Sequence, residues 1–272
     1  MRNVVVSGSF DNIKSPHVRF LQEAARLGPL RVLLWSDEVV RHLEGKTPKF
    51  PQAERMYILE SLRYVQGVTL CTGTVRIDAL PQCEGPRPAI WAVDEASDTP
   101  AGRDYCRSRG LEYRVLRGAD LAGFPPEPAD AAETPSRKRV IVTGCYDWFH
   151  SGHVRFFEEA STLGDLYAVV GHDANIEFLK GKGHPLYGEQ ERRYMVQSVR
   201  FVKQALISSG MGWLDAEPEI EHIKPDIYMV NEDGDRPEKK QYCEAHGIEY
   251  QVLKRIPKDG LPRRVGTELR GF

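Results

Sequence analysis

The sequence predicts an α/β fold: two tandem doubly wound domains, each with a five-stranded parallel sheet. Two observations predict it. The chain of 272 residues repeats itself at an offset of 136 to 137 residues. Within each copy, short runs of β-branched and other apolar residues alternate with segments of helical spacing, which is typical of βα units.

The repeat extends along most of the chain. Val6–Asp11 lies over Val142–Asp147, and residues 87–117 lie over 224–254 with thirteen of the 31 positions identical. Chance alone gives about two identities at average composition. A period this long indicates a duplicated domain and not a solenoid.

In the second copy, each expected strand is a short apolar run and is followed by a helical pattern. We expect strands at 140–142, 166–170, 205–207, 227–230 and 250–253, and helices near 153–162, 174–180, 190–202, 217–223 and 237–245. Apolar strands separated by helices predict a parallel sheet that is covered on both faces. Ligands of such sheets bind beyond the carboxyl ends of the strands, where the strand order reverses.

A proline-rich stretch marks the join between the copies. Four prolines lie among small and charged residues between positions 119 and 138. Such a composition buries too little apolar surface to fold by itself, so it predicts a semi-rigid linker. We therefore expect a first domain at 1–118, a linker at 119–138 and a second domain at 139–272.

Charge and hydropathy exclude several classes of partner. The chain has 37 Lys and Arg against 39 Asp and Glu, a net charge of -2. This balance argues against a general nucleic-acid binder, which needs a surplus of cations. The absence of a long apolar run or of a secretory leader argues against membrane insertion and secretion. We expect a cytoplasmic protein that acts on small charged metabolites, with a homodimer and a pairing of the two domains within one chain both left open.

The five cysteines do not predict a disulfide framework or a zinc site. Their number is odd and no C-x-x-C pair occurs. We expect reduced thiols.

The chemistry is predicted to lie where the first strand of the second copy ends. Residues 144–153 read Gly-Cys-Tyr-Asp-Trp-Phe-His-Ser-Gly-His. A helix start offers unpaired backbone N–H groups and a positive dipole end, both suited to phosphate oxygens. Gly152 lets a ligand approach the backbone closely. His150 and His153, three residues apart, share a helix face and can donate hydrogen bonds to a phosphoryl group.

Two plainer interpretations of the histidines stand beside this one. Histidines are more often structural than catalytic, and metal ligation would need a third ligand at a suitable spacing, which is missing. The ten-residue context between a strand and a helix favours the functional interpretation.

This segment resembles the H-x-G-H nucleotidyltransferase superfamily, in particular its cytidylyltransferase-like members, whose domains are Rossmann-like. They include glycerol-3-phosphate and phosphoethanolamine cytidylyltransferases and heptose-phosphate adenylyltransferases. The resemblance covers nearly all of the second copy. It rests on residues 144–153, on Asp173 and on Glu191-Arg192.

The resemblance implies transfer of CMP from CTP to a small phosphate-bearing acceptor, with release of pyrophosphate and with Mg²⁺ accompanying the nucleotide. Adenylyl transfer from ATP to a sugar phosphate or a similar acceptor is the alternative enzyme, and a nucleotide-sensing module is the alternative from another class. The attacking phosphate oxygen is already ionised, so catalysis needs positioning and charge neutralisation and no strong base.

The resemblance also assigns roles to residues of the second copy. The expected catalytic residues are His150, His153, Lys180 and Lys182. The expected nucleotide-binding residues are Gly144, Tyr146, Gly152, Asn231, Arg264 and Thr267. The expected substrate-binding residues are Asp147, Asp173 and Arg192, and no residue is expected to bind a resident metal.

Some of these assignments have alternatives in the sequence. Lys180 and Lys182 lie in a glycine-rich segment, which by itself is more often a solvated basic loop. Arg192 could instead pair with a glutamate on its own helix. The family has a terminal R-x-x-G-I-S-T-T-like segment, but Val265 and Gly266 stand where hydroxyl residues are expected, which weakens the expected triphosphate contact.

The first copy lacks several of these residues. Lys14 stands in the place of His150, Pro16 in that of Gly152, and Glu44 in that of Lys180. Proline removes an N–H from the helix start and adds bulk. The terminal Arg/Thr segment has no counterpart. We expect the first domain to keep the fold without transfer activity.

Overall fold

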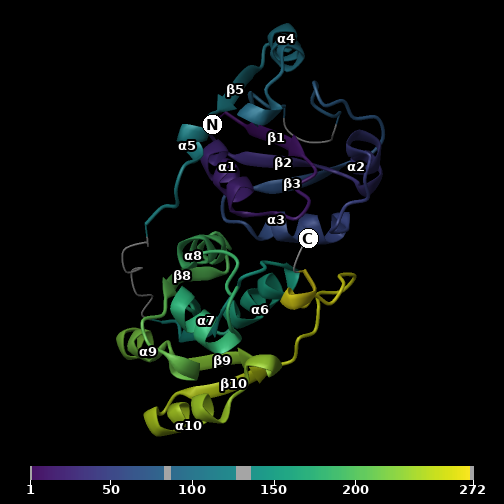
Figure 1. The fold of residues 1–272 in the computed structure, drawn as a ribbon. Helices are drawn as coiled ribbons and strands as arrows, with labels where there is room; N and C mark the ends of the chain where they lie inside the picture. Colours follow the sequence, from purple (N-terminus) through teal and green to yellow (C-terminus); the bar gives the residue numbers. More distant parts are fainter. Residues whose placement is uncertain (1, 83–86, 127–135, 270–272) are drawn as a thin grey trace. The chain divides into compact units, whose positions relative to one another are not determined.

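The computed structural model describes residues 2–82, 87–126 and 136–269. They form two compact units that divide between Gly123 and Phe124. Each unit contains one five-stranded sheet in which all strand pairs are parallel. The predicted fold class is therefore confirmed (Figure 1).

The first domain has the strands β1 Val4–Gly8, β2 Leu30–Trp35, β3 Gly67–Cys71, β4 Ile90–Asp94 and β5 Glu112–Leu116. Its helices are α1 Ser15–Ala25, α2 Asp37–Glu44, α3 Gln52–Ser61, α4 Pro100–Arg109 and α5 Gly118–Leu121, with a 3₁₀ turn, η1, at Glu95–Ser97. The strand order is β3-β2-β1-β4-β5. Helix α5 occupies the first residues of the predicted linker, and 127–135 lie outside the described residues.

The second domain has the strands β6 Arg139–Gly144, β7 Asp165–Val170, β8 Val202–Ile207, β9 Ile227–Asn231 and β10 Glu249–Leu253. Its helices are α6 Ser151–Ser161, α7 Asp173–Lys180, α8 Glu189–Gln197, α9 Glu217–Ile223 and α10 Pro237–His246. Its 3₁₀ turns are η2 Gly212–Leu214, η3 Glu232–Gly234 and η4 Gly266–Leu269. The strand order β10-β9-β6-β7-β8 matches that of the first domain, and the direction of chain progression reverses between β6 and β9.

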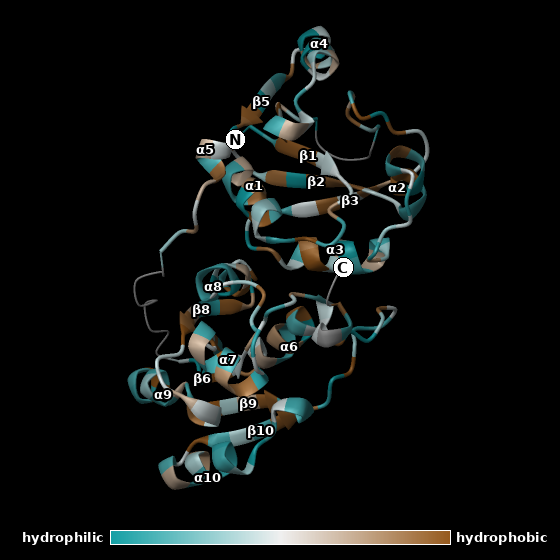
Figure 2. Ribbon diagram, in the orientation of Figure 1, coloured by the Kyte–Doolittle hydropathy of each residue, from teal (hydrophilic) through white to brown (hydrophobic). Residues whose placement is uncertain are grey.

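Alternate residues of the central strand β6 serve two separate cores in the second domain. Val140 and Val142 pack in a cluster with residues of α6 and α8, such as Phe157. Ile141 packs in a second cluster with residues of α9 and α10, such as Ile220. Both faces of the sheet are therefore buried, as the apolar strands predict. Figure 2 shows hydrophobic residues along the strands of both domains.

Two expectations about local structure are wrong. The helix expected over 190–202 ends at Gln197, because the buried Val199 lies in a turn that leads into β8, where Val202 pairs with Leu166. The expectation of reduced thiols fails for Cys71, which is disulfide-bonded. Cys106, Cys145 and Cys243 are free, and Cys83 lies outside the described residues.

Within the described part of the chain, no helix has both the length and the apolar character needed to cross a membrane.

Candidate active site

The loop between β6 and α6 begins with a tyrosine packed over a glycine. Tyr146 adopts a left-handed backbone conformation with φ 54°, and the residue is 5% exposed. A Cβ at Gly144 would lie 2.7 Å from that ring. The ring contacts Phe157 and His153, with centroids 5.2 and 5.3 Å apart. Gly144 is thus required by the packing of Tyr146 as well as by any ligand above it.

His150 is the N-cap of α6. Its Nδ1 accepts a hydrogen bond from the backbone N–H of Gly152 at 3.0 Å. An accepting Nδ1 carries no proton, so the neutral ring must carry its proton on Nε2. A Cβ at position 152 would lie 2.8 Å from the ring Cε1 of His150. Glycine is therefore needed here to make room for the imidazole, a reason that the sequence alone did not reveal.

The two histidines of the motif stack on each other and are held neutral. Their ring centroids are 4.0 Å apart, and His150 is 1% exposed. Burial, together with the charges of Arg255 and Arg264, lowers the pKa of His150 to about 3. Burial also lowers the pKa of His153 well below its usual value, together with the charges of His150, Arg255 and Lys180. Repulsion by cations is expected where a site is built to receive an anion.

Three buried polar atoms around this stack have no hydrogen-bond partner among the described residues. They are Nε2 of His150, Nδ1 of His153 and the hydroxyl of Tyr146. Buried polar groups normally find partners, so unpaired ones need an explanation. All three residues line a cavity of about 380 Å³. A ligand in this cavity would supply the missing partners.

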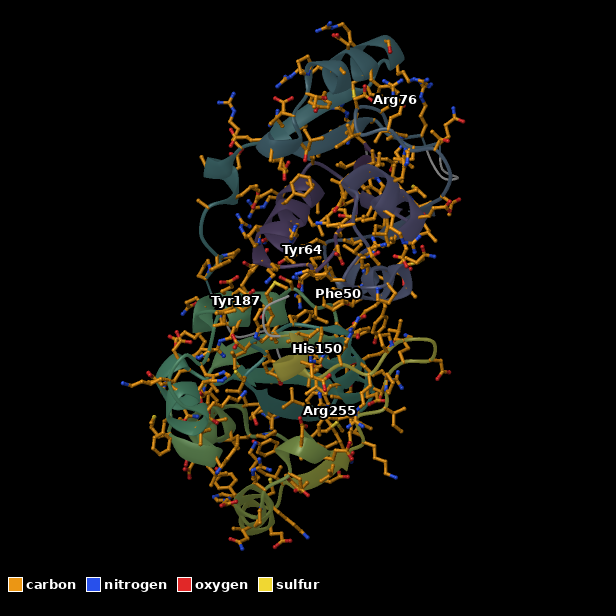
Figure 3. All side chains as sticks on the ribbon, turned by 45° about the vertical axis from the view of Figure 1, so that its right-hand side comes forward. Phe50, Tyr64, Arg76, His150, Tyr187 and Arg255 are labelled. Carbon is orange, nitrogen blue, oxygen red and sulfur yellow. The ribbon has the colours of Figure 1, made fainter. Side chains whose placement is uncertain are left out.

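The cavity lies at the carboxyl ends of β6, β7 and β9, which includes the crevice where the strand order reverses. Of the predicted site residues, the structure places the following in its wall: Gly144, Tyr146, Asp147, His150, Gly152, His153, Lys180 and Asn231. Figure 3 shows His150 and Arg255 within the second domain.

The two predicted catalytic lysines have different positions. Lys180 is the last residue of α7 and lines the cavity, whereas Lys182 is exposed and is not part of its wall. Gly181 and Gly183 have φ of 87° and 85°, a region that favours glycine. The chain therefore turns sharply on both sides of Lys182, and His184 returns to the cavity.

The three predicted substrate-binding residues form a framework that holds the loops of the site. Both carboxylate oxygens of Asp147 accept from the backbone N–H of Leu186 at 2.9 Å, and one also accepts from Tyr187. Arg192 is 1% exposed. Its guanidinium donates to the carbonyl oxygens of Tyr187, Cys145 and Gly171 and to the carboxylate of Asp173.

The first domain has the same framework without the histidine pair. Asp11 accepts from the backbone N–H groups of Lys49 and Phe50. Arg55 donates to the carbonyls of Phe50 and Ser9 and to the carboxylate of Asp37. Because a domain lacking the motif retains these bonds, we assign Asp147, Asp173 and Arg192 to the positioning of loops.

Replacing the framework arginine is expected to destabilise either domain. Arg192→Met would leave three carbonyl oxygens and a carboxylate without their donor, which typically costs about 2 to 4 kcal/mol. Arg55→Met, in the domain without the motif, should cost a similar amount. Urea unfolding of both variants against wild type measures this. An Arg192→Met protein that unfolds like wild type but loses ligand binding would contradict the assignment and favour direct substrate contact.

Arg255 is a site residue that the sequence did not single out. It follows β10 by two residues, and its side chain is 18% exposed. Its guanidinium pairs with Asp233 at 2.7 Å and donates to the carbonyl of Arg264 at 3.1 Å. The position just beyond the last strand of a parallel sheet was the available signal, since ligands bind at that edge.

Next to the main cavity is a small pocket of about 30 Å³ beside the first turns of α6. Its wall includes Asn231 and six basic residues, which are Arg155, Lys254, Arg255, Lys258, Arg263 and Arg264. Glu159 also lines this pocket and pairs with Arg155. The positive end of α6 and the other five basic side chains suit the oxygens of a polyphosphate. Thr267 lies in η4, and its side chain is outside the described residues.

The carboxylates that line the main cavity do not form a metal cage. Asp147 accepts backbone N–H groups, Asp215 accepts from Ser208, and Asp233 pairs with Arg255. Among the described residues, no group of three His, Cys, Asp or Glu side chains could hold a metal. This donor set suits Mg²⁺ only as an ion held mainly by phosphate oxygens, which is a common arrangement for Mg²⁺.

The corresponding loop of the first domain is built differently. Lys14 is the N-cap of α1, and its backbone N–H donates to Nδ1 of His17 at 3.0 Å. Pro16 has no N–H that could bond an N-cap imidazole. Glu44 pairs with Lys46 at 3.1 Å. The stacked and neutral histidine pair of the second domain therefore has no equivalent at these positions.

Comparison with known proteins identifies the family. Two segments, residues 5–108 and 141–248, match the model of the family described as cytidylyltransferase-like. Together they make up more than half of the chain, with one segment in each domain. The chain belongs to the cytidylyltransferase-like family. The resemblance seen in the sequence is confirmed, and both domains of this family member are nucleotidyltransferase-like.

Named relatives of this cytidylyltransferase-like protein include FAD synthases. That of Aciduliprofundum boonei is 37% identical over 119 residues, 43% of this chain and 76% of that protein. That of Methanosarcina mazei is 32% identical over 146 residues, 53% of this chain and 82% of that protein. The bifunctional protein HldE of Pelobacter propionicus is 40% identical over 78 residues, 28% of this chain and 16% of that protein.

Among solved structures, a lipopolysaccharide core biosynthesis protein from Thermoplasma volcanium is similar. The similarity covers 46% of this chain and 100% of that chain, with a TM-score of 0.38 and 24% sequence identity.

Proposed function

We propose that the second domain is an adenylyltransferase that transfers AMP from ATP to the phosphate of FMN, producing FAD and pyrophosphate. The observation that carries transfer chemistry is the neutral histidine stack in the cavity, with its unpaired nitrogen atoms beside Lys180 and Arg255. The choice of ATP and FMN is supported by relatives named FAD synthase, of which the chain covers 76% and 82%.

The reaction suits the groups that the cavity contains. A phosphate oxygen of FMN attacks the α-phosphorus of ATP, a new P–O bond forms, and the bond to the bridging oxygen of pyrophosphate breaks. The nucleophile is already an anion, so no proton has to be removed. What the protein must supply is alignment and neutralisation of the growing negative charge.

Each group of the site has a place in this scheme. Nε2–H of His150 donates to an oxygen on the α-phosphate, and His153 holds the His150 ring by stacking and lines the same wall. Lys180 and Arg255 neutralise negative charge on either side of the α-phosphate. Arg264 and the pocket beside α6 bind the terminal phosphates. Asn231, at the carboxyl end of β9, contacts the nucleotide. Lys182 is proposed to reach the phosphates only when the ligand is bound.

Mg²⁺ is proposed to enter with ATP as its counter-ion and to neutralise phosphate charge. The engaged carboxylates of the cavity leave its binding to phosphate oxygens and water. The first domain, with Lys14 and Pro16 at the helix start, is proposed to be inactive in transfer.

Transfer of CMP from CTP was the leading expectation from the sequence. The named relatives support its adenylyl alternative better, because FAD contains an adenosine monophosphate unit. The cytidylyl reaction is therefore kept as an outcome of the test.

The test is pyrophosphate release by the full chain with each of the four common nucleoside triphosphates and a panel of phosphate monoesters. The panel contains FMN, glycerol 3-phosphate, phosphoethanolamine and a heptose phosphate. Turnover is expected with ATP and FMN, with FAD detected by its fluorescence after separation. Turnover with CTP and another acceptor would replace the proposed reaction. No turnover with any pair would favour a nucleotide-sensing module.

A further inference from the structure

Lys239 is a buried lysine that the motif does not explain. It is the third residue of α10, it is 7% exposed, and it lines the main cavity. Lysine is almost never this deeply buried unless its ammonium group is paired. A cation also opposes the dipole at the N-terminal end of a helix, where anions are favoured. Both its burial and its position are therefore unfavourable for the free protein.

The contacts of the Lys239 ammonium do not neutralise it. Nζ donates to Oγ1 of Thr143 at 3.0 Å and lies 5.5 Å from the ring centroid of Tyr228. The Thr143 hydroxyl is itself 2.8 Å from the hydroxyl of Tyr228. Within the described part of the chain, no carboxylate forms an ion pair with Lys239. One neutral acceptor and an aromatic face leave an ammonium group with unused donors.

The electrostatic surroundings agree with this description. Burial lowers the pKa of Lys239, the charge of Asp215 raises it, and that of Arg236 lowers it. A desolvated cation is costly unless an anion compensates it. Asp215 compensates the ammonium group only in part, since among the described residues it forms no ion pair with Lys239. An anionic ligand in the cavity would supply the rest.

The repeat shows that the fold does not need this lysine. Position 239 corresponds to Gly102, the third residue of α4, at the same offset that aligns Pro237 with Pro100. Helix α4 forms with glycine there, and Gly102 donates its backbone N–H to Thr99. The first domain thus lacks the lysine together with the histidine at the helix start.

A second cation and an aromatic ring line the same end of the cavity as Lys239. The guanidinium of Arg236 lies 4.3 Å from the ring centroid of Trp213, and Trp213 is 42% exposed. Both line the main cavity, and neither lines the small pocket beside α6. Lys239 likewise lines only the main cavity. The cations near Lys239 are therefore separate from those proposed to bind the terminal phosphates.

We propose that Lys239 binds the phosphate group of the acceptor and holds it for attack on the α-phosphorus. The identity of the acceptor as FMN rests on the proposed function, but the binding of a phosphate monoester by Lys239 does not. The α-phosphate then lies between the acceptor phosphate and the pyrophosphate leaving group, so that attacking and leaving oxygens have separate cationic partners.

The test is isothermal titration of FMN and of inorganic phosphate into the full chain saturated with a non-hydrolysable ATP analogue. Lys239→Met is compared with wild type and with Lys240→Met, a matched control in which the neighbouring lysine is exposed. Loss of a charge-assisted hydrogen bond predicts at least about tenfold weaker binding of both ligands to Lys239→Met. The analogue itself should bind within about twofold of wild type, and Lys240→Met should match wild type in every titration.

Thermal unfolding separates binding from a structural role. Replacing an incompletely compensated buried cation by methionine should keep or raise the Tm of the second domain, since the desolvation penalty disappears. A lower Tm with unchanged phosphate affinity would overturn the proposal. Equal weakening of the ATP analogue, or no binding of inorganic phosphate to wild type, would also overturn it. Failure of FMN alone to bind would reject FMN as the acceptor and leave the Lys239 result standing.

Discussion

His150→Asn is expected to lower kcat for pyrophosphate release by about 100- to 1000-fold, the usual effect of losing one preorganised donor to a developing negative charge. Asparagine is a good N-cap and can still accept from the start of α6, so the helix should keep its stability. It cannot present a donor at the position of Nε2. This variant therefore separates the proposed hydrogen-bond donation by His150 from its role as a cap.

The matched variants make this result specific. His150→Ala removes both functions and should in addition lower stability by about 1 kcal/mol. His17→Ala, in the domain without the paired imidazole, should leave kcat unchanged. Retention of more than a tenth of wild-type kcat by His150→Asn, with its fold intact, would show that His150 only caps the helix.

The stability of the second domain is expected to fall steeply in mild acid. The pKa of His150 is lowered from 6.5 to about 3 in the folded protein. Below pH 6.5 His150 binds a proton in the unfolded chain but stays unprotonated in the folded state. The free energy of unfolding therefore decreases as pH falls. One such group contributes a slope of about 1.4 kcal/mol per pH unit between about pH 6 and pH 4.

Urea unfolding of wild type and of His150→Asn across this pH range measures the effect. Other groups also titrate there, and the difference between the two proteins removes the contribution of those that do not interact with His150. The asparagine variant should lose stability less steeply, by about 1.4 kcal/mol per pH unit. Parallel curves would mean that His150 is protonated in the folded state at these pH values, contrary to its neutral role.

Much of the fold was predictable because it depends on local patterns. Apolar strands alternate with helical segments, and the repeat shows that the pattern occurs twice. The end of α8 was missed, because Val199 fits a helical pattern and its position in a turn depends on where β8 must pair. The disulfide at Cys71 was missed because cysteine spacing says little about which residues the fold brings together.

The candidate site was only partly predictable. The H-x-G-H segment is local, so His150 and His153 could be located before their surroundings were known. Arg255 follows strand β10 and Lys239 lies on helix α10, and no spacing connects them to residue 150. The sequence also could not show that Asp147 and Arg192 bond to backbone groups. Aspartate and arginine side chains bind ligands in some proteins and hold loops in others, and the sequence does not distinguish the two roles. Gly152 was predicted to let a ligand approach the backbone, and the structure adds a second reason for glycine there, since its missing Cβ makes room for the ring of His150.

The aspartate and arginine framework present in both domains has a consequence for how such a protein can change. The positions that hold the loops are separate from those that line the cavity with histidine and lysine. The histidine and lysine positions can therefore vary while the loops keep their conformation. Duplication would then supply a spare copy that can lose or regain chemistry without unfolding. The substitutions Lys14→His, Pro16→Gly, Glu44→Lys and Gly102→Lys in the first domain would test directly whether such a copy can regain chemistry without unfolding.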